Sequence, residues 1–358
     1  MIISRDLGHS GGVVNYVRLL IQNLDDKKFQ IRHFKQGRNP DNNEGIFLPL
    51  IIILQFFSFN KILKNDRPDV VHVNPSLGWI AIIRDSIYIL IAYLHGIPII
   101  CFMRGWDTSI SRRFSRNIIF SIPFRILFNL PKLILTLASQ HKSDLQALGI
   151  PSNKIKLTTT MVNAKIFGKK KKDFSHDINI LYCGNLIRKK GIFELVRTIP
   201  RILIEFPDTQ FTFLGKGIEF DAINLLIEKL NLSNNVKLLG YMSGREKIIA
   251  FQNSHVLILP SYTEGFPNVY CEAMAAGLPF IGTDVGGLTD VVEDGIQGFL
   301  LKSVPPDPTE ICDVVVELMR HPNLMESISK NNYTEADEKY DVSVKCKEIG
   351  GYYLEIAS

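Results

Sequence analysis

Cysteine is scarce in this sequence, and the cysteines present form no cluster. The 358 residues contain five: Cys101, Cys183, Cys271, Cys312 and Cys346. No two of them form a CxxC pair and their number is odd, so the pattern supports neither a zinc ribbon nor a disulfide framework. We therefore expect a protein of a reducing compartment.

Long apolar segments are missing as well. The uncharged run over residues 45–60 is 16 residues long, whereas a helix needs about 20 to span a bilayer. The first ten residues carry Arg5 and Asp6 and have no apolar core, unlike a secretory signal. The sequence therefore predicts a cytoplasmic chain without a membrane-spanning helix.

Motifs of several other enzyme classes are absent too. There is no DxD triplet of the kind that bridges a cation and a nucleotide, so no metal is implied. No GxGxxG follows the first apolar run with an acidic residue about 20 positions later, which argues against a dinucleotide-dependent oxidoreductase. The histidines show no ligand spacing. We expect neither a metal nor another cofactor, and no nucleic acid among the partners.

The composition that remains is that of a globular protein with two domains. Hydrophobic residues make up 46% and charged residues 22%, which excludes collagen, coiled coil and general disorder. A chain of 358 residues is too long for one small core and fits two domains of about 100 to 200 residues each.

Charge is divided unevenly between the halves of the chain. Residues 1–165 hold 21 Lys and Arg against 10 Asp and Glu, while residues 166–358 hold 20 against 26. An anionic partner, such as an acidic membrane surface or a polyanionic acceptor, would favour the first half. A surface that only keeps the protein soluble explains this charge equally well.

Short β-rich runs alternate with segments of helical period, which is the pattern of an α/β fold. In the first half the strand candidates are MIIS, QIRHF, DVVHV, PIICFM and KLILTLA, and the helix candidates are residues 13–24, 48–64, 79–94 and 114–129. The strand candidates are continuously apolar rather than alternating, so we expect a parallel sheet buried on both faces. The first domain is predicted to be doubly wound.

The same pattern restarts after a charged stretch. We predict a Rossmann-like domain over residues 1–165, a linker over 166–177, a second Rossmann-like domain over 178–335, and a final helix over 336–358. The basic run Lys169–Lys172 is interpreted as part of a solvated linker rather than a phosphate site. Strand ends of two such domains are expected to face a cleft.

The most informative segment covers residues 259–287, LPSYTEGFPNVYCEAMAAGLPFIGTDVGG. A strand ends at LILP and a helix begins near Pro267, which suits a first helical turn. Gly265 lets the backbone approach a ligand, and the N–H groups that begin the helix would point at an anion such as a diphosphate. Glu264 and Glu272 would address hydroxyl groups. An isolated pair of glutamates is ordinarily a helix cap and a surface acid.

This segment resembles the nucleotide-sugar segment of retaining glycosyltransferases of family 4, which have the GT-B fold of two Rossmann-like domains. The resemblance includes the ExxxxxxxE pattern from Glu264 to Glu272, then AMAAGLP and TDVGG, and continues through LTDVVEDGIQGFLL. Upstream, YCGNLIRKKGIFELV resembles the opening of the family's second domain, and GGVVNYVRLLIQNL its first glycine loop and helix. The resemblance implies that residues 1–165 form the acceptor-binding domain, that residues 178–335 form the nucleotide-sugar-binding domain, and that the helix over 336–358 crosses back to the first domain.

The resemblance implies roles for individual residues. Glu272 would contact the ribose, and Glu264 would lie near the sugar. Lys190 would neutralise the diphosphate, for which a point charge is suited. Backbone groups of Gly265, Phe266, Pro267, Asn268 and Val269 would hold phosphate, Gly11 and Gly12 would open the first helix beneath it, and Gly215 would border the nucleotide or form a tight turn.

The chain departs from the family pattern at two sites. Asn185 stands where the family usually has Arg, so one phosphate-binding charge is missing, and Arg188 is a substitute or a solvated side chain. Arg104 stands where relatives often have a histidine near the sugar; it is not a base, but it can hold an oxyanion or an acidic sugar. For Asp107 the sequence leaves two interpretations open: contact with a donor or acceptor hydroxyl, or capping of a loop.

The sequence thus predicts a retaining, metal-independent hexosyltransferase acting on a glycan or lipid-linked acceptor. Basic amphipathic segments at 48–64 and 114–129 favour peripheral attachment to an anionic membrane, although packing on the sheet accounts for their apolar residues about as well. The main alternative, motivated by Asn185 and Arg104, is a catalytically inactive nucleotide-sugar-binding subunit of a membrane-surface assembly. A same-fold epimerase is disfavoured by the ExxxxxxxE segment.

Overall fold

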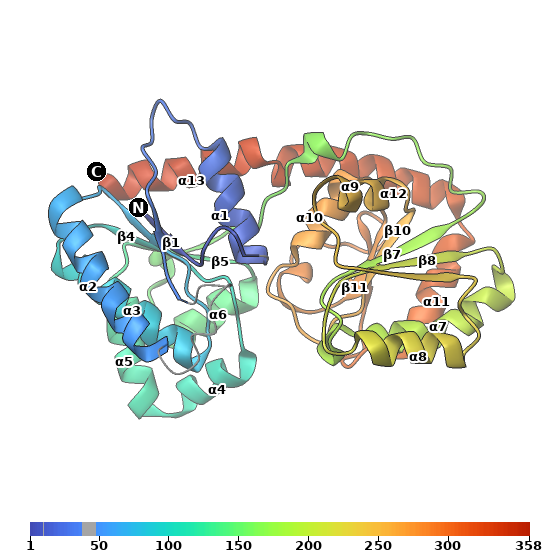
Figure 1. The fold of residues 1–358 in the computed structure, drawn as a ribbon, viewed down its shortest axis with the longest axis horizontal. Helices are drawn as coiled ribbons and strands as arrows, with labels where there is room; N and C mark the ends of the chain where they lie inside the picture. Colours follow the sequence, from blue (N-terminus) through green and yellow to red (C-terminus); the bar gives the residue numbers. More distant parts are fainter. Residues whose placement is uncertain (10, 38–47) are drawn as a thin grey trace. The chain divides into compact units, whose positions relative to one another are not determined.

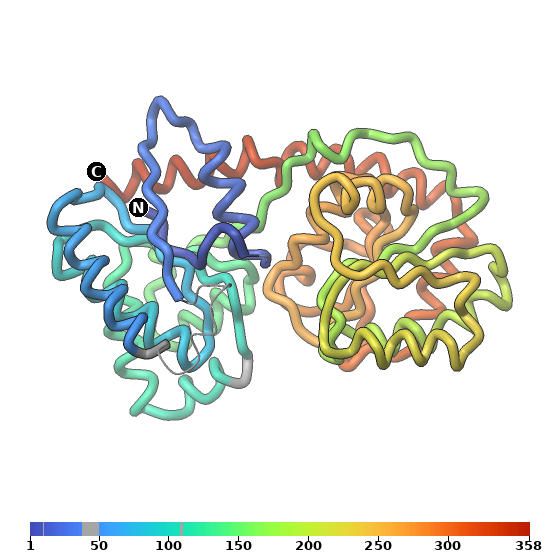
Figure 2. The backbone as a smooth tube through the Cα atoms, in the orientation of Figure 1, coloured from blue at the N-terminus to red at the C-terminus, as the bar shows by residue number. Residues whose placement is uncertain are grey.

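The computed structural model describes residues 1–9, 11–37 and 48–358, and only the backbone at 48–49 and 108–109. It divides into two compact units: unit 1 comprises Met1–Thr160 and Val342–Ser358, and unit 2 comprises Met161–Asp341. The first boundary lies five residues before the expected position at 165. Figure 2 shows that the chain leaves unit 1 for unit 2 and then returns, so both ends of the chain lie in unit 1.

Unit 1 is a parallel six-stranded sheet with helices on both faces, in the strand order β2-β1-β3-β4-β5-β6 (Figure 1). Its strands are β1 (Ile2–Ser4), β2 (His33–Lys35), β3 (Val71–Val73), β4 (Ile99–Phe102), β5 (Leu133–Thr136) and β6 (Ile155–Leu157). Its helices are α1 (Gly12–Asn23), α2 (Leu48–Asp66), α3 (Trp79–Leu94), α4 (Thr108–Arg116), α5 (Ile118–Phe128), α6 (Ser139–Ala147), α13 (Val342–Ala357) and the 3₁₀ turn η1 (Ser152–Lys154).

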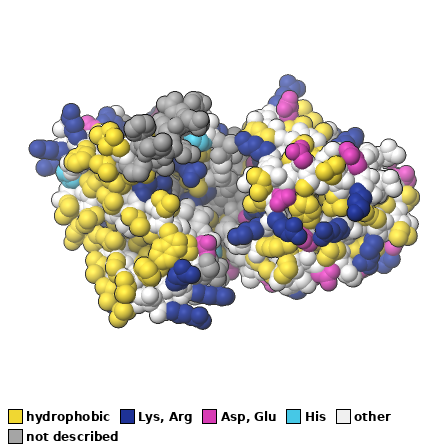
Figure 3. Space-filling model, turned by 60° about the horizontal axis from the view of Figure 1, so that its bottom comes forward, with side chains coloured by type: hydrophobic (Ala, Val, Ile, Leu, Met, Phe, Trp, Pro, Cys, Tyr) yellow, Lys and Arg dark blue, Asp and Glu magenta, His cyan; other side chains and the backbone are white. Residues whose placement is uncertain are grey.

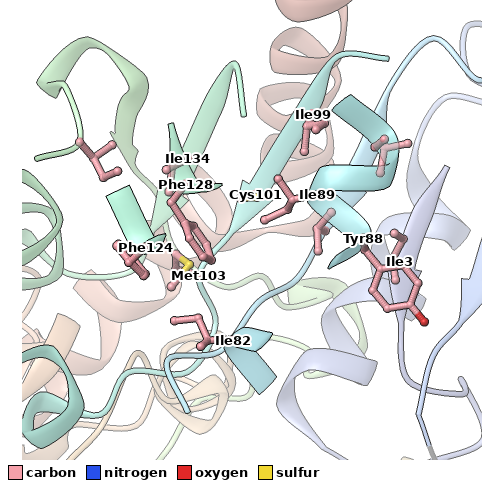
Figure 4. Packing of buried hydrophobic residues seen from close by; sticks show 14 of the residues in the cluster. Ile3, Ile82, Tyr88, Ile89, Ile99, Cys101, Met103, Phe124, Phe128 and Ile134 are labelled. Carbon is pink, nitrogen blue, oxygen red and sulfur yellow. The ribbon is translucent and has the colours of Figure 1, made fainter. Parts of the chain in front are cut away.

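The core of unit 1 is centred on strands in which every residue is buried. The strands β1, β3, β4 and β5 are buried throughout, as continuously apolar strands of a parallel sheet should be. Figure 4 shows Ile3, Ile99, Cys101 and Ile134 of these strands among side chains of α3 and α5, including Phe128. The apolar runs of the sequence therefore mark this core correctly.

Unit 2 is also a parallel six-stranded sheet, with the order β12-β11-β10-β7-β8-β9. Its strands are β7 (Asn179–Cys183), β8 (Gln210–Leu214), β9 (Val236–Gly240), β10 (Val256–Leu259), β11 (Phe280–Thr283) and β12 (Gly298–Leu301). Its helices are α7 (Ile192–Glu205), α8 (Phe220–Lys229), α9 (Gly244–Gln252), α10 (Asn268–Ala275), α11 (Pro308–Met319) and α12 (Pro322–Glu335). Short turns are η2 (Ala164–Ile166), η3 (Arg188–Lys190), η4 (Gly286–Leu288) and the π-helical η5 (Ala336–Tyr340).

One expected helix is two helices in the structure. The apolar period predicts a single helix over residues 114–129, but α4 ends at Arg116 and α5 begins at Ile118. The side chain of Asn117 accepts a hydrogen bond of 2.9 Å from the backbone N–H of Ile119, which is the contact of a helix N-cap. Asn117 therefore starts a new helix inside the predicted one.

The stretch expected to be a solvated linker, residues 166–177, is packed into unit 2. Phe167, Lys172 and Phe174 are buried. The ammonium of Lys172 donates to the backbone carbonyls of Gln252 at 2.9 Å and Ser254 at 2.6 Å, while Lys169 pairs with Asp337. Unsatisfied carbonyls at the end of α9 attract this charge, because a helix leaves its last carbonyls without partners.

The last helix begins later than expected. Residues 336–340 form η5, which continues α12 within unit 2, and α13 starts only at Val342. In unit 1, α13 packs against α1, and the two helices lie side by side in Figure 1. The hydroxyl of Tyr353 on α13 is 2.6 Å from Nδ1 of buried His72 on β3.

Candidate nucleotide-sugar site

The strand order of unit 2 reverses direction between β7 and β10, the two strands at its centre. In doubly wound sheets, ligands bind beyond the carboxyl ends of the strands at such a switch point. The segment after β7 carries Asn185, Arg188 and Lys190, and the segment after β10 carries Glu264 and the start of α10. The topology thus brings the predicted donor residues of unit 2 to one edge of the sheet.

Lys190 and Glu264 join the two segments directly. The Nζ atom of Lys190 lies 2.5 Å from Oε1 of Glu264, and the hydroxyl of Ser261 donates to the same oxygen at 2.7 Å. The Lys190 side chain is 21% exposed and that of Glu264 9%. Because both are largely withdrawn from water, their charges interact more strongly than a surface pair would. The pair is held in place yet keeps access to a ligand.

Glu272 is held by a second lysine, Lys247 of α9. Nζ of Lys247 lies 2.7 Å from Oε1 and 2.6 Å from Oε2 of Glu272. Burial acts to lower the pKa of Lys247, but the Glu272 carboxylate outweighs it and raises the pKa above the ordinary value. Lys247 therefore stays charged, donates a hydrogen bond to Oε1 of Glu272 and lies beside Oε2.

The start of α10 combines a helix N-terminus with a packed side chain. Pro267 is the N-cap residue, with extended backbone, and the helix runs from Asn268. The Phe266 ring is buried against Tyr270 and Tyr340 at centroid distances of 5.7 and 6.2 Å, so its side chain belongs to the core. Val269 is partly exposed. The first N–H groups of such a helix suit an anion.

The glycine pair of the TDVGG motif lies against the loop that precedes α10. The N–H of Gly287 donates to the carbonyl of Gly265 at 2.6 Å. A Cβ at Gly286, which has φ +61°, would lie 2.1 Å from the carbonyl oxygen of Glu264. A larger residue would displace that loop, so the motif and the predicted phosphate segment are one structural unit.

Three further predicted residues lie after β7 and β8. Asn185 and Arg188 are exposed, and the Arg188 guanidinium lies 5.5 Å from the Phe193 ring. A Cβ on Gly215 would lie 1.8 Å from the carbonyl oxygen of Gly184, so Gly215 is required by the close approach of two backbone segments. This packing explains the glycine without a ligand.

The predicted residues of unit 1 follow its own strands β1 and β4. Gly11 is the N-cap of α1, which begins at Gly12. The Arg104 guanidinium lies 4.1 Å from the Tyr16 ring centroid and 4.4 Å from that of Phe102, an arrangement of cation–π type. The carboxylate of Asp107 accepts from the N–H of Ile110 at 3.2 Å, which is the capping contact left open by the sequence.

Three residues of the site were not predicted from the sequence motifs: Lys247, Ser261 and Tyr262. The motifs single out neither Lys247, 25 residues before Glu272, nor Ser261 beside Glu264. Tyr262 was also missed; its hydroxyl donates to Glu194 at 2.9 Å, and its N–H to the carbonyl of Lys189 at 2.9 Å. Only the ExxxxxxxE motif, extended three residues upstream, would have indicated Ser261. Over residues 1–9, 11–37 and 48–358, no group of His, Cys, Asp and Glu is arranged to hold a metal ion.

Family comparisons agree with this geometry across most of the chain. The model of glycosyl transferases group 1 matches residues 164–335, and that of glycosyltransferase family 4 matches residues 10–165. The chain belongs to glycosyltransferase family 4. The resemblance carried by residues 259–287 is thereby confirmed.

Several known proteins match parts of this chain. An uncharacterized glycosyltransferase of Methanocaldococcus jannaschii is 27% identical over 233 residues, which is 62% of this chain and 59% of the relative. The N-acetyl-alpha-D-glucosaminyl L-malate synthase of Bacillus anthracis is 30% identical over 158 residues, 43% of this chain and 40% of that protein. The capsular polysaccharide biosynthesis glycosyltransferase CapM of Staphylococcus aureus is 27% identical over 222 residues, 61% and 56%. The matches thus span less than two thirds of these relatives.

Solved structures share the fold over nearly the whole chain. Sucrose-phosphate synthase from Thermosynechococcus elongatus superposes with a TM-score of 0.80 at 18% identity, covering 99% of this chain and 98% of that one. Anabaena HepE in complex with UDP and glucose gives 0.74 at 15% identity, with the same coverage. The family 4 chain therefore has the GT-B fold, with two Rossmann-like units, as expected.

Proposed function

We propose that this family 4 chain is a retaining, metal-independent hexosyltransferase that moves a sugar from a nucleoside diphosphate sugar to a glycan or lipid-linked acceptor. The observation that carries the proposal is the Lys190–Glu264 pair at the switch point of unit 2, beside the start of α10. The names of CapM and HepE support it, the first through polysaccharide biosynthesis and the second through bound UDP and glucose.

The donor would be held in unit 2 by groups of complementary chemistry. Lys190 donates one of its three N–H bonds to Glu264, which leaves two for diphosphate oxygens. Together with the first N–H groups of α10, it would stabilise the charge that develops on the leaving diphosphate. Glu272, which pairs with Lys247, would accept hydrogen bonds from the ribose hydroxyls.

Glu264 would orient the sugar. Its two bonds, from Lys190 and Ser261, both end on Oε1, so Oε2 is the oxygen offered to a sugar hydroxyl. Retention would follow from attack of the acceptor hydroxyl on the face that the diphosphate leaves. The bond from the anomeric carbon to the diphosphate oxygen breaks, the new glycosidic bond forms, and the acceptor proton passes to the departing phosphate.

The acceptor and the cellular location are further parts of the proposal. We assign the acceptor to unit 1, whose half of the sequence carries the excess of basic residues, and place the enzyme in the cytoplasm at the inner face of the membrane. No helix in the described part of the chain is long and apolar enough to cross a membrane.

An experiment with a panel of nucleoside diphosphate sugars tests the proposal. Nucleoside diphosphate release is measured with and without bacterial lipid extract, which supplies lipid-linked acceptors. Release from one donor, raised by the extract, is expected; Glu272→Ala should weaken donor binding, and Glu264→Ala should lower kcat with a smaller effect on nucleotide affinity. Full activity of Glu264→Ala would remove the role assigned to that residue.

The same donor panel, combined with a measurement of the melting temperature, separates the enzyme from an inactive binding subunit. That second function is favoured by Asn185, an exposed neutral side chain where the family usually has an arginine. If a nucleoside diphosphate raises the melting temperature but no donor is consumed with any extract, the binding subunit is the better description.

A further inference from the structure

Three helices of unit 1 expose large apolar side chains. In α2 and α3 their spacing places them on one face of the helix, and in α5 Ile118, Ile122 and Ile126 share a face, with Ile119 and Phe120 exposed beside it. The exposed residues are Leu50, Ile53, Leu54 and Phe57 of α2, Ile80, Ile83, Leu90, Tyr93 and Leu94 of α3, and Ile118, Ile119, Phe120, Ile122 and Ile126 of α5. We call these fourteen residues the apolar face.

The three helices are neighbours, so their exposed sides adjoin. Helix α3 packs against α2 and against α5, and their opposite sides bury Phe59, Tyr88 and Phe124 in the core. Figure 3 shows hydrophobic side chains gathered over this side of unit 1. The face holds 14 of the 26 large hydrophobic residues that are exposed in the described chain, so it is a concentration and not a random scatter.

Exposure at the face is far greater than core packing requires. Ile80 is 80% exposed, Leu94 74% and Ile119 71%. Monomeric soluble proteins rarely expose contiguous apolar patches of more than a few hundred Å², and larger ones mark interaction sites. Packing on the sheet, the alternative left open by the sequence, accounts for the buried sides of these helices but not for the exposed ones.

The exposed charged side chains of α2 and α4 that border the face are mostly basic. Helix α4, which leads into α5, carries exposed Arg112, Arg113 and Arg116, and the exposed side of α2 continues from its apolar residues to Lys61 and Lys64.

Few carboxylates of the described residues offset these cations. The helices α2 to α5 themselves contain Asp66, which pairs with Arg32, and Asp85, which is buried beside Arg84; exposed Asp69 and Asp107 lie in the adjoining loops. A second copy of this surface would bring like charges together, whereas an anionic lipid surface complements them.

We propose that unit 1 binds an anionic lipid bilayer through the apolar face, with the arginines of α4 and the lysines of α2 at the lipid phosphates. The helices lie in the interface without spanning it, as amphipathic helices with basic borders do. The proposed lipid surface depends on the proposed function in one respect, which is that it would bring the enzyme to a lipid-linked acceptor. Lipid binding itself is measured without any sugar donor.

Vesicle flotation tests the surface. The full chain is mixed with vesicles of phosphatidylcholine alone or of phosphatidylcholine with phosphatidylglycerol. We expect flotation with the anionic vesicles, weaker flotation with the neutral ones, and a fall in binding as salt is raised, because surface charges are screened.

Variants assign the binding to residues. Ile80→Ser combined with Ile119→Ser is expected to lower the partition constant about tenfold or more, because two exposed apolar side chains no longer enter the interface. Arg112→Gln with Arg113→Gln should remove most of the preference for anionic vesicles. The matched control is Ile204→Ser with Ile218→Ser in unit 2, whose side chains are 84% and 89% exposed and which should bind as the unchanged protein does.

Three outcomes would overturn the proposal: no flotation with anionic vesicles, equal loss of binding in the control, or a dimer in solution that Ile80→Ser dissociates while vesicles are not bound. The melting-temperature shift with a nucleoside diphosphate is recorded for every variant. A retained shift with lost flotation assigns the defect to the lipid surface, whereas flotation without any shift leaves this surface standing and counts against the proposed transferase.

Discussion

Lys247 and Glu272 lie on different helices, α9 and α10, and their ion pair fixes a carboxylate at the edge of the sheet. The two side chains are 20% and 14% exposed. Removing one partner of a largely buried pair leaves the other charge uncompensated. The orientation of Glu272 therefore depends on a residue that lies outside the ExxxxxxxE motif in sequence.

We predict that Lys247→Met weakens nucleoside diphosphate binding about tenfold, equivalent to about 1.4 kcal/mol, because Glu272 loses the contact that orients it. Isothermal titration calorimetry measures the dissociation constant. Lys330→Met is the control, since Lys330 pairs with Glu326 on the surface of α12 and is 74% exposed. An unchanged dissociation constant in Lys247→Met would show that Glu272 needs no such support.

Buried His72 predicts a pH dependence of stability in unit 1. Burial, assisted by the charges of the amino terminus and Arg104, lowers the pKa of His72 to about 3. The folded protein keeps His72 neutral while the unfolded chain protonates it below pH about 6.5. Its contribution is therefore fully present above that pH and is lost as pH falls, by about 1.4 kcal/mol for each pH unit.

His72→Asn tests this dependence. The variant should be less stable than the parent at pH about 7.5, and the difference should narrow as pH falls from about 6.5 to 5, because Asn does not titrate. Urea unfolding followed by tryptophan fluorescence suits the measurement, since both tryptophans, Trp79 and Trp106, lie in unit 1. Parallel stability curves would contradict the prediction.

At the scale of helices and strands, Asn117 decides where α5 begins. Asn117→Ala removes the side-chain acceptor of the Ile119 N–H and is expected to lower the free energy of unfolding by about 1 kcal/mol. Asn117→Ser, which can still cap, should lose less. The same fluorescence-detected urea titration compares the two, and equal losses would mean that the cap contributes nothing.

Local patterns predicted most elements, because apolar period and strand burial are local properties. Helix α3 has the predicted bounds, and each strand candidate overlaps a strand, although β2 extends one residue beyond QIRHF. The short strand β6 was not predicted, since three residues, IKL, carry too little pattern. Lys172 was read as solvated because the carbonyls it contacts lie about 80 positions away in sequence and no local pattern reveals them.

The candidate site was predictable to the same extent. Residues within one motif, such as Glu264 and Gly265, could be assigned from their resemblance to the family. Lys247 could not, because its partner is reached only through the packing of two helices. For Gly215 the sequence could not decide between a ligand contact and a tight turn. The structure shows that the glycine is required because the backbone of Gly184 approaches it closely.

At the scale of the whole molecule, unit 1 is built from two separate parts of the chain, and α13 is the second. Tyr353 of α13 is buried, and its ring centroid lies 6.1 Å from that of Phe29 and 5.8 Å from that of His72 on β3. The stability of unit 1 should therefore depend on a helix that follows unit 2 in sequence.

We predict that Tyr353→Ala lowers the free energy of unfolding of unit 1 by about 3 to 5 kcal/mol, as truncation of large buried aromatic residues does. Leu354→Ala, one position along and 57% exposed, should change it little. Tryptophan fluorescence again reports unit 1 alone. Equal effects of the two substitutions would mean that α13 adds no packing to this unit.

The late position of α13 also sets an order of events during synthesis. A ribosome completes residues 161–341 before it makes Val342, so all of unit 2 can emerge and fold while unit 1 still lacks its covering helix. Domains usually fold from the amino-terminal end as they are made. In this chain unit 1 begins before unit 2 and is completed after it, so its nascent apolar surface stays open to chaperones while residues 161–341 are made.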